Sequence, residues 1–283
     1  MLSHNNIDVN ILNSIYFIND KQNDFVFNDN DSQSSDFNDE INYIWNQPKG
    51  NEKDYKHTAL CLAILNQDIE IIDLLLKNKN IDLNKNNQID GNELNALHLS
   101  VKLGYIEIVK KLISFDSINI NALCKYNSSD KKTALFIATE LKNIEIIKVL
   151  LSSEKIDVNI INEIDIYYYQ CSSKNIIRSI CSKKTVLYFA VEKGYNKIVK
   201  ILLSNNKIDV NVVNHITIED KELNINKKHK IRTVLHLAVK KENIDIIKDL
   251  LDRKDINRDI LDEKKKKAID YVQNDQIIQL LSK

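Results

Sequence analysis

The residues whose types best suit binding or chemistry lie in one stretch, residues 160–183. This stretch holds three consecutive tyrosines, Tyr167, Tyr168 and Tyr169, and then Arg178. Tyr and Arg side chains often supply much of the binding energy at protein interfaces. A loop that packs on itself or on its neighbour could use the same side chains. The cluster is therefore consistent with a partner contact and with internal packing.

Two of the four cysteines, Cys171 and Cys181, lie in the same stretch. A hairpin could bring their thiols together as a disulfide or as part of a metal site, but a structural zinc site takes four ligands. Cys61 and Cys124 are isolated, and no two cysteines form a Cys-x-x-Cys pair. We therefore expect free thiols, no bound metal and a reducing compartment, which would be the cytoplasm or, alternatively, the nucleus.

Two basic runs, residues 227–232 (KKHKIR) and Lys264–Lys267, could contact nucleic acid or act as localisation signals. No aromatic residues alternate with these lysines to stack on bases. Acidic residues lie close by in the sequence, and the whole chain balances 40 Lys and Arg against 40 Asp and Glu. A solvated, charge-balanced surface is the favoured interpretation, and nucleic acid is a disfavoured partner.

Catalytic chemistry has little support in the sequence. His98 and His236 would need a nucleophile and an orienting partner, and the segments around them supply neither. The usual nucleotide-binding, serine-hydrolase and zinc-protease motifs do not occur, and the four glycines are dispersed. No run of apolar residues is long enough to predict a membrane span. We expect no enzyme, no cofactor, no small-molecule substrate and no membrane insertion.

The elements that position these residues form an internal repeat. Five segments share one pattern and begin at His57, Leu94, Lys132, Lys184 and Arg232. Each reads as two short amphipathic helices separated by a polar break, followed by a tail similar to Ile-Asp-Val-Asn. In the third copy Thr133 is a predicted helix cap, and Lys142-Asn143 is the predicted break. Helices of two to three turns are marginal alone, so the copies must stack to bury their apolar faces.

The repeats resemble the ankyrin family. The family signature T-P-L-H-x-A is matched by residues 233–238 (TVLHLA), 95–100 (NALHLS) and 58–63 (TALCLA), with Ala or Val at the proline position in every copy. Gly104-Tyr105 and Gly194-Tyr195 match the turn before the second helix. The resemblance implies an all-α fold: an ankyrin-type helix-turn-helix repeat solenoid with β-hairpin or loop fingers, several of them lengthened.

The predicted boundaries follow from the spacing of the copies. The signature positions 58, 95, 133, 185 and 233 are 37, 38, 52 and 48 residues apart, whereas the family period is about 33. The extra residues fall in the fingers, of which Ile160–Lys183 and Val212–Ile231 are the longest. The predicted repeats span 57–93, 94–131, 132–183, 184–231 and 232–263, with a C-terminal cap at 264–283.

The segments before the array are irregular. Residues 1–13 resemble residues 202–214 and are interpreted as the remnant of a preceding repeat, so the N-terminal cap is degenerate or the array is part of a longer one. Residues 14–56 are interpreted as an acidic, Asn-rich insertion that is partly disordered. The array itself is predicted to cover 57–283.

The resemblance implies a non-enzymatic scaffold, expected to be monomeric, that binds an unidentified partner protein on its concave and finger surface. The alternative is a regulatory or targeting part of a longer enzyme or adaptor. The candidate contact residues are the finger cluster above and the exposed ends of the first helices, where residue types vary from copy to copy. These helix-end positions are Asn66, Lys102, Leu103, Glu140, Leu141, Glu192, Lys193, Lys240 and Lys241.

Overall fold

The computed structural model describes residues 13–14, 56–126, 129–169, 176–220 and 225–282. The predicted remnant at 1–13 and the predicted insertion at 14–56 fall almost entirely outside the described residues, as does Cys171. Within the described ranges, no helix has the length and apolar character needed to cross a membrane. The chain divides into two compact units: the first ends at Ile81 and includes Asn87–Gly91, and the second comprises Asp82–Asn86 and Asn92–Lys283.

The first unit contains the helix pair of the first predicted repeat. Its elements are β1 (Asn13–Ser14), β2 (Lys56–His57), α2 (Ala59–Leu65), α3 (Ile69–Leu76) and β3 (Asn87–Ile89). Strands β1 and β2 pair antiparallel. The Thr58 hydroxyl caps α2 by accepting a hydrogen bond from the Cys61 amide at 3.3 Å, and the Asp68 carboxylate caps α3 in the same way.

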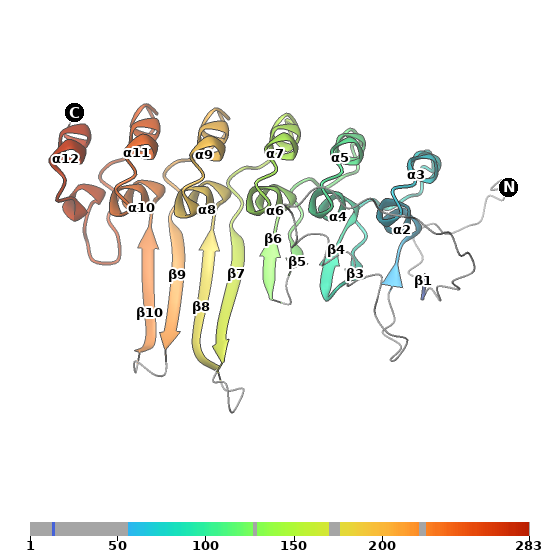
Figure 1. The fold of residues 1–283 in the computed structure, drawn as a ribbon, viewed down its shortest axis with the longest axis horizontal. Helices are drawn as coiled ribbons and strands as arrows, with labels where there is room; N and C mark the ends of the chain where they lie inside the picture. The colour runs from blue at the N-terminus through green and yellow to red at the C-terminus, as the bar shows by residue number, and fades with distance from the viewer. Residues whose placement is uncertain (1–12, 15–55, 127–128, 170–175, 221–224, 283) are drawn as a thin grey trace, which may run out of the picture. The chain divides into compact units, whose positions relative to one another are not determined.

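The second unit repeats this helix pair along the chain. Its helices are α4 (Ala96–Lys102), α5 (Ile106–Ile113), α6 (Ala134–Glu140), α7 (Ile144–Leu151), α8 (Val186–Lys193), α9 (Asn196–Leu203), α10 (Val234–Lys240), α11 (Ile244–Leu251), the 3₁₀ helix η1 (Ala268–Tyr271) and α12 (Asp275–Leu281). Its strands are β4 (Asn92–Leu94), β5 (Cys124–Tyr126), β6 (Asp130–Lys132), β7 (Asn162–Tyr169), β8 (Ile176–Lys184), β9 (Asn214–Asp220) and β10 (Ile225–Arg232). In Figure 1 the first helices of successive pairs, α4, α6, α8 and α10, lie side by side next to the strands, and the second helices form a row above them, on the side away from the strands.

Local sequence explains where these helices begin and break. The side chains of Thr133, Thr185 and Thr233 cap α6, α8 and α10, each accepting from the amide three residues later. Gly194 sits in the turn after α8 with φ of 71°, in the left-handed region that favours glycine. Lys142 occupies the same turn after α6 with φ of 55°, which confirms the predicted break there.

The core of the second unit is made of the apolar faces that the repeat predicts. Each first helix buries nearly every side chain, as α6 does from Ala134 to Thr139. Each second helix buries only its inward stripe, such as Ile146, Ile147 and Leu150 in α7. A first helix therefore lies between neighbours on several sides, and a second helix keeps one charged face in water. This is the packing expected of stacked repeats.

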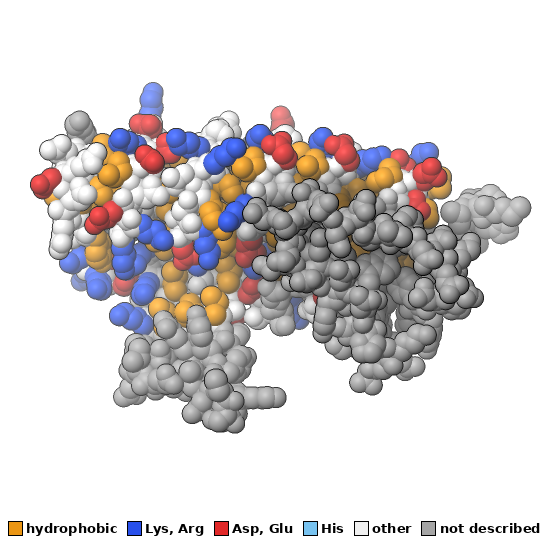
Figure 2. Space-filling model, viewed as in Figure 1, with side chains coloured by type: hydrophobic (Ala, Val, Ile, Leu, Met, Phe, Trp, Pro, Cys, Tyr) orange, Lys and Arg blue, Asp and Glu red, His pale blue; other side chains and the backbone are white. Residues whose placement is uncertain are grey.

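The fingers are strands, so the expectation of an all-α fold is wrong in that respect. Strands β4 to β10 are hydrogen bonded in chain order in one antiparallel sheet. The long fingers β7–β8 and β9–β10 extend well beyond the helices in Figure 1, and β8 also pairs with β9. Alternating β-branched residues, as in Ile164-Asp165-Ile166, favour this extended conformation over a loose loop. In Figure 2 hydrophobic side chains gather over these strands, below the helices.

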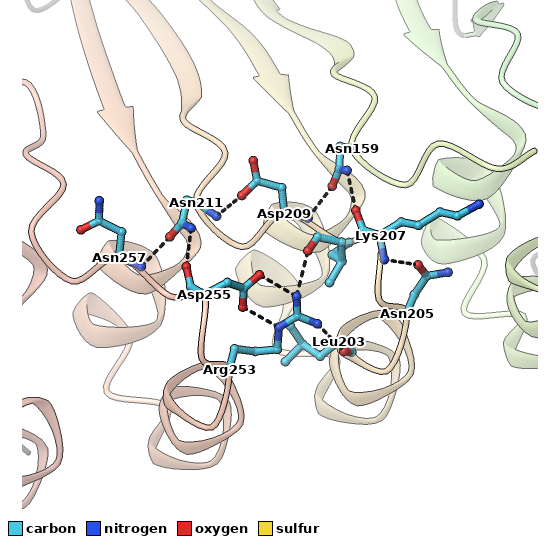
Figure 3. Close-up of polar contacts among 10 residues, drawn as sticks. Asn159, Leu203, Asn205, Lys207, Asp209, Asn211, Arg253, Asp255 and Asn257 are labelled. Carbon is cyan, nitrogen blue, oxygen red and sulfur yellow. Dashed lines mark hydrogen bonds and ion pairs between the residues drawn. The ribbon is translucent and has the colours of Figure 1, made fainter. Parts of the chain in front are cut away.

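The tails after the second helices link successive repeats. The Asn159 side chain donates from Nδ2 to the Lys207 carbonyl and accepts at Oδ1 from the Asp209 amide, both at 2.8 Å (Figure 3). Asn211 makes the same two bonds one repeat later, to the Asp255 carbonyl and the Asn257 amide. Asn84 and Asn121 do likewise earlier in the unit. These asparagines form a ladder that holds one repeat to the next.

The tail of the fifth repeat does not lie where the sequence pattern predicted it. Asn257 occupies the ladder position of Asp209, because both donate their amide to an asparagine of the preceding tail. The fifth tail is therefore Ile256-Asn257-Arg258-Asp259 and not the predicted Asp255-Ile256-Asn257. Asp259 replaces the terminal asparagine, and its carboxylate binds Lys267 at 2.7 Å. A carboxylate has no N–H to donate, so the ladder ends here.

Candidate interaction surface

The structure places the predicted helix-end positions at the C-terminal ends of the first helices. Lys102, Glu140, Lys193 and Lys240 are the last residues of α4, α6, α8 and α10, and Asn66 follows α2 in the first unit. Leu103, Leu141 and Lys241 follow their helices directly, and Glu192 is the penultimate residue of α8. Leu141 is 41% exposed, and Lys193, Lys240 and Lys241 are also exposed. These positions are therefore accessible to a partner.

Two of the predicted contact residues also hold buried cations. Lys132 is only 3% exposed, and its Nζ lies 3.0 Å from Glu140 and 2.9 Å from Asp130. One repeat later, Lys184 binds Glu192 at 2.7 Å in the same way. Burial raises the pKa of the Glu140 carboxyl, and the attraction of Lys132 opposes that rise. Glu140 and Glu192 thus connect the end of a finger to the end of a first helix.

Sequence reasoning missed these buried lysines. The signal was present as a spacing: a cation stands immediately before the capping threonine at Lys132 and Lys184, and a glutamate follows eight residues later in both copies. Charged residues are rarely buried unless they are paired, so a lysine before a helix gives no sign of burial when its partner is not recognised. The spacing of eight residues between the lysine and the glutamate indicates an ion pair only once the end of the finger is known to lie beside the end of the first helix.

The last full repeat breaks this pairing and gathers cations. Arg232 stands at the position of Lys132 and Lys184, but Lys240 takes the place of the glutamate. The guanidinium of Arg232 lies 3.7 Å from Glu263. The pKa of Lys240 is lowered, first by the charge of Arg232 and then by burial. We name the residues Lys228, Lys230, Arg232 and Lys240 the basic rim.

The tyrosine cluster is described only through its backbone. Tyr167, Tyr168 and Tyr169 end β7, and the register pairs Tyr168 with Arg178 of β8. The side chains of these four residues lie outside the described part, so their role in contact or packing stays a prediction. Cys181 lies in β8 as a free thiol, and burial raises its pKa to about 11.

The two histidines have backbone partners. The Nε2 atom of His98 lies 3.1 Å from the Ala122 carbonyl oxygen, and that of His236 lies 3.1 Å from the Lys266 carbonyl oxygen. Burial lowers the pKa of His98 to about 4, so this imidazole is neutral at pH 7. Among the described residues, no group of three or more His, Cys, Asp and Glu is placed to hold a metal ion.

Comparisons with known proteins agree with the geometry. A family model for ankyrin repeats in three copies matches residues 80–162, and a single ankyrin repeat model matches 55–88, 182–215 and 231–263. The comparison with curated proteins finds no match.

Solved structures show the same fold. The ankyrin repeat protein EF0377 is 20% identical and has a TM-score of 0.51, with 79% of this chain and 94% of that chain covered. An ankyrin repeat domain from Acinetobacter baumannii AYE is 18% identical, with the same TM-score and coverage. The family models together match more than half of the 283 residues, and the chain belongs to the ankyrin repeat family.

Proposed function

We propose that this chain is a non-enzymatic scaffold that holds a partner protein on the surface formed by its fingers and by the ends of its first helices. Ankyrin repeats in general are protein–protein interaction modules. The observation that carries the proposal is a contrast between equivalent positions. The first helices keep a buried, mostly apolar pattern with Leu at the same position in each copy, while the last residue of the helix, which is at least partly exposed, changes from Lys102 to Glu140 to Lys240.

Such a surface would bind by complementarity and not by chemistry. The caps and the ladder order the repeats, and the buried lysine pairs hold the ends of α6 and α8 in place. The partner would therefore meet a largely preformed surface. Leu103 and Leu141 would supply apolar contact, and the neighbouring charges would select the partner's charge pattern. Cys61, Cys124 and Cys181 are free thiols, which supports the proposal of an intracellular protein.

Affinity capture with the full chain tests this proposal. The bait would be compared with Lys240→Glu at the end of α10 and with Lys248→Glu, a matched control on the exposed face of α11 in the same repeat. We expect the captured protein to be lost with Lys240→Glu and kept with Lys248→Glu. A partner that is kept by the first variant and lost with the second would place binding on the second helices and overturn the proposal.

A further inference from the structure

The long fingers present two cross-strand rows of side chains on one face of the sheet. The first row runs Ile166, Ile180, Ile218 and Lys228, and the second runs Ile164, Ser182, Ile216 and Lys230. Residues directly opposite in antiparallel strands point to the same face. We name Ile164, Ile166, Ile180, Ile216 and Ile218 the isoleucine face. It ends at β10, where each row finishes in a lysine of the basic rim.

The isoleucine face is open to solvent. Ile166 is 43% exposed, and the other four side chains are partly exposed. In Figure 2 the hydrophobic side chains lie below the helices over these strands, with Lys and Arg beside them on the β10 side. An antiparallel sheet with one apolar face normally packs that face on a core. An apolar face left in water with a charged border is typical of an interaction site.

The opposite face of the same sheet has polar partners of its own. Glu163 of β7 binds Lys183 of β8 at 3.2 Å, and the Thr217 hydroxyl lies 3.1 Å from His229 Nδ1. These are cross-strand contacts between adjacent strands on the face away from the isoleucines. The contrast shows that the strands separate apolar from polar residues by face.

The outer edge of β10 is less suited to docking. The Glu263 carboxylate accepts a hydrogen bond from the Ile231 amide at 3.0 Å, which covers an edge N–H that an added strand would need. The face is therefore a better docking surface than the edge.

The charge beside the isoleucine face is concentrated and positive. The pKa of Lys230 is lowered by burial and then by the charges of Arg232, Lys240 and Lys228. Lys264 adds to the repulsion at Lys240, and Glu263 opposes it. Like charges held this close to one another favour an anionic ligand, which would relieve their repulsion.

We propose that the isoleucine face and the basic rim together bind an acidic protein segment that carries aliphatic or aromatic side chains. The inference rests on the proposed function and specifies its partner's chemistry. The apolar side chains of the segment cover Ile166, Ile180 and Ile218, and its carboxylates pair with Lys228 and Lys230. Ile218, Ile180 and Ile166 lie one, two and three strands away from Lys228. Neighbouring strands are about 5 Å apart, so the apolar groups of the segment lie roughly 5–15 Å from its acidic groups.

Peptide selection on the full chain tests the inference. A displayed library of random 12-residue peptides would be panned on the protein, and an enriched peptide would be labelled and titrated by fluorescence anisotropy. We expect enrichment of Asp and Glu together with Ile, Leu, Val or Phe, and an affinity that falls as salt rises.

Two variants and one matched control locate the binding. Ile218→Asp is expected to weaken the peptide at least tenfold, and Lys230→Glu to do the same without altering the apolar face. Thr217→Asp puts the same carboxylate one residue away, on the opposite face of β9, and is expected to leave affinity within about twofold. Circular dichroism would check that each variant is folded. If Ile218→Asp unfolds the protein, Lys230→Glu alone decides the test.

Several results would overturn the inference. One is a peptide whose affinity falls with Thr217→Asp and not with Ile218→Asp or Lys230→Glu. Another is the absence of any enriched peptide, or enrichment without acidic residues. A third is tighter binding of a single-stranded oligonucleotide than of any peptide. A fourth is a dimer by sedimentation that Ile218→Asp converts to a monomer, which would make the occupant a second copy. The Lys240 and Lys248 capture pair tests the proposed function separately.

Discussion

The helical stack of the second unit and the sheet of its long fingers both contain many isoleucines, but these side chains are buried in the stack and partly exposed in the sheet. In the stack, Ile146 and Ile147 are fully buried against neighbouring helices. In the finger sheet, Ile166 and Ile218 sit in rows that reach into solvent. Hydrophobicity alone therefore does not show which aliphatic residues stabilise the stack and which belong to the proposed binding face. The separation comes from which residues the repeat covers and which lie beyond its helices.

The comparison predicts a large difference between two truncations of isoleucine. Ile147→Ala in α7 is expected to lower the free energy of unfolding by about 2–5 kcal/mol, since it leaves a cavity in a packed core. Ile218→Ala in β9 is expected to cost less than about 1 kcal/mol, because its side chain is already partly in water. Urea unfolding of both variants measures the difference. Equal losses would show that the isoleucine face is part of the core.

The buried imidazole in the stack makes stability depend on pH. His98 has a pKa of about 4 in the folded protein, below the usual 6.5, because of burial. The neutral form is favoured on folding, so this stability is present above pH 6.5 and is lost as pH falls towards 4. From pH 7 to pH 5 the loss is expected to be about 2 kcal/mol.

His98→Phe is the matched variant for this prediction, because Phe136 fills the equivalent position in the next repeat. Urea unfolding at pH 7 and pH 5 is expected to show a smaller loss for the variant than for the wild type. The same loss in both would assign the pH dependence to other groups.

Alanine substitutions in the asparagine ladder are expected to lower stability by a smaller amount, and by less at the end of the ladder than in its middle. Asn159→Ala removes two hydrogen bonds to the next repeat and is expected to cost about 1–2 kcal/mol. Asn257, at the end of the ladder, accepts from the Asp259 amide within its own tail, and Asn257→Ala is expected to cost about 0.5 kcal/mol. Thermal unfolding distinguishes the two, and a greater cost at Asn257 would contradict a ladder that ends there.

Sequence patterns predicted the stack well because its determinants are local. Capping threonines such as Thr133 and the helical spacing of apolar residues act within one repeat, so they can be read from one copy. The fifth tail was misaligned because Arg258 replaces the usual aliphatic residue, and the triplet Asp255-Ile256-Asn257 imitates the Asp-Val-Asn part of the motif two residues early.

The finger sheet was harder to predict because its determinants are not local. The alternation at Ile164 and Ile166, repeated at Ile216 and Ile218, is visible in the sequence and favours strands. Which strands pair, and in which register, depends on contacts between residues tens of positions apart, such as Ile180 with Ile218. A slip of one residue would move every isoleucine to the other face. The site's apolar face therefore emerged only from the register.

Hydrogen exchange with and without a bound acidic peptide tests most directly whether the stack carries stability and the finger sheet carries binding. With the selected peptide at saturation, the amides of β8, β9 and β10 are predicted to gain protection, while those of the outer helices α7, α9 and α11 stay unchanged. Added protection confined to the outer helices, with none in the finger strands, would contradict the account.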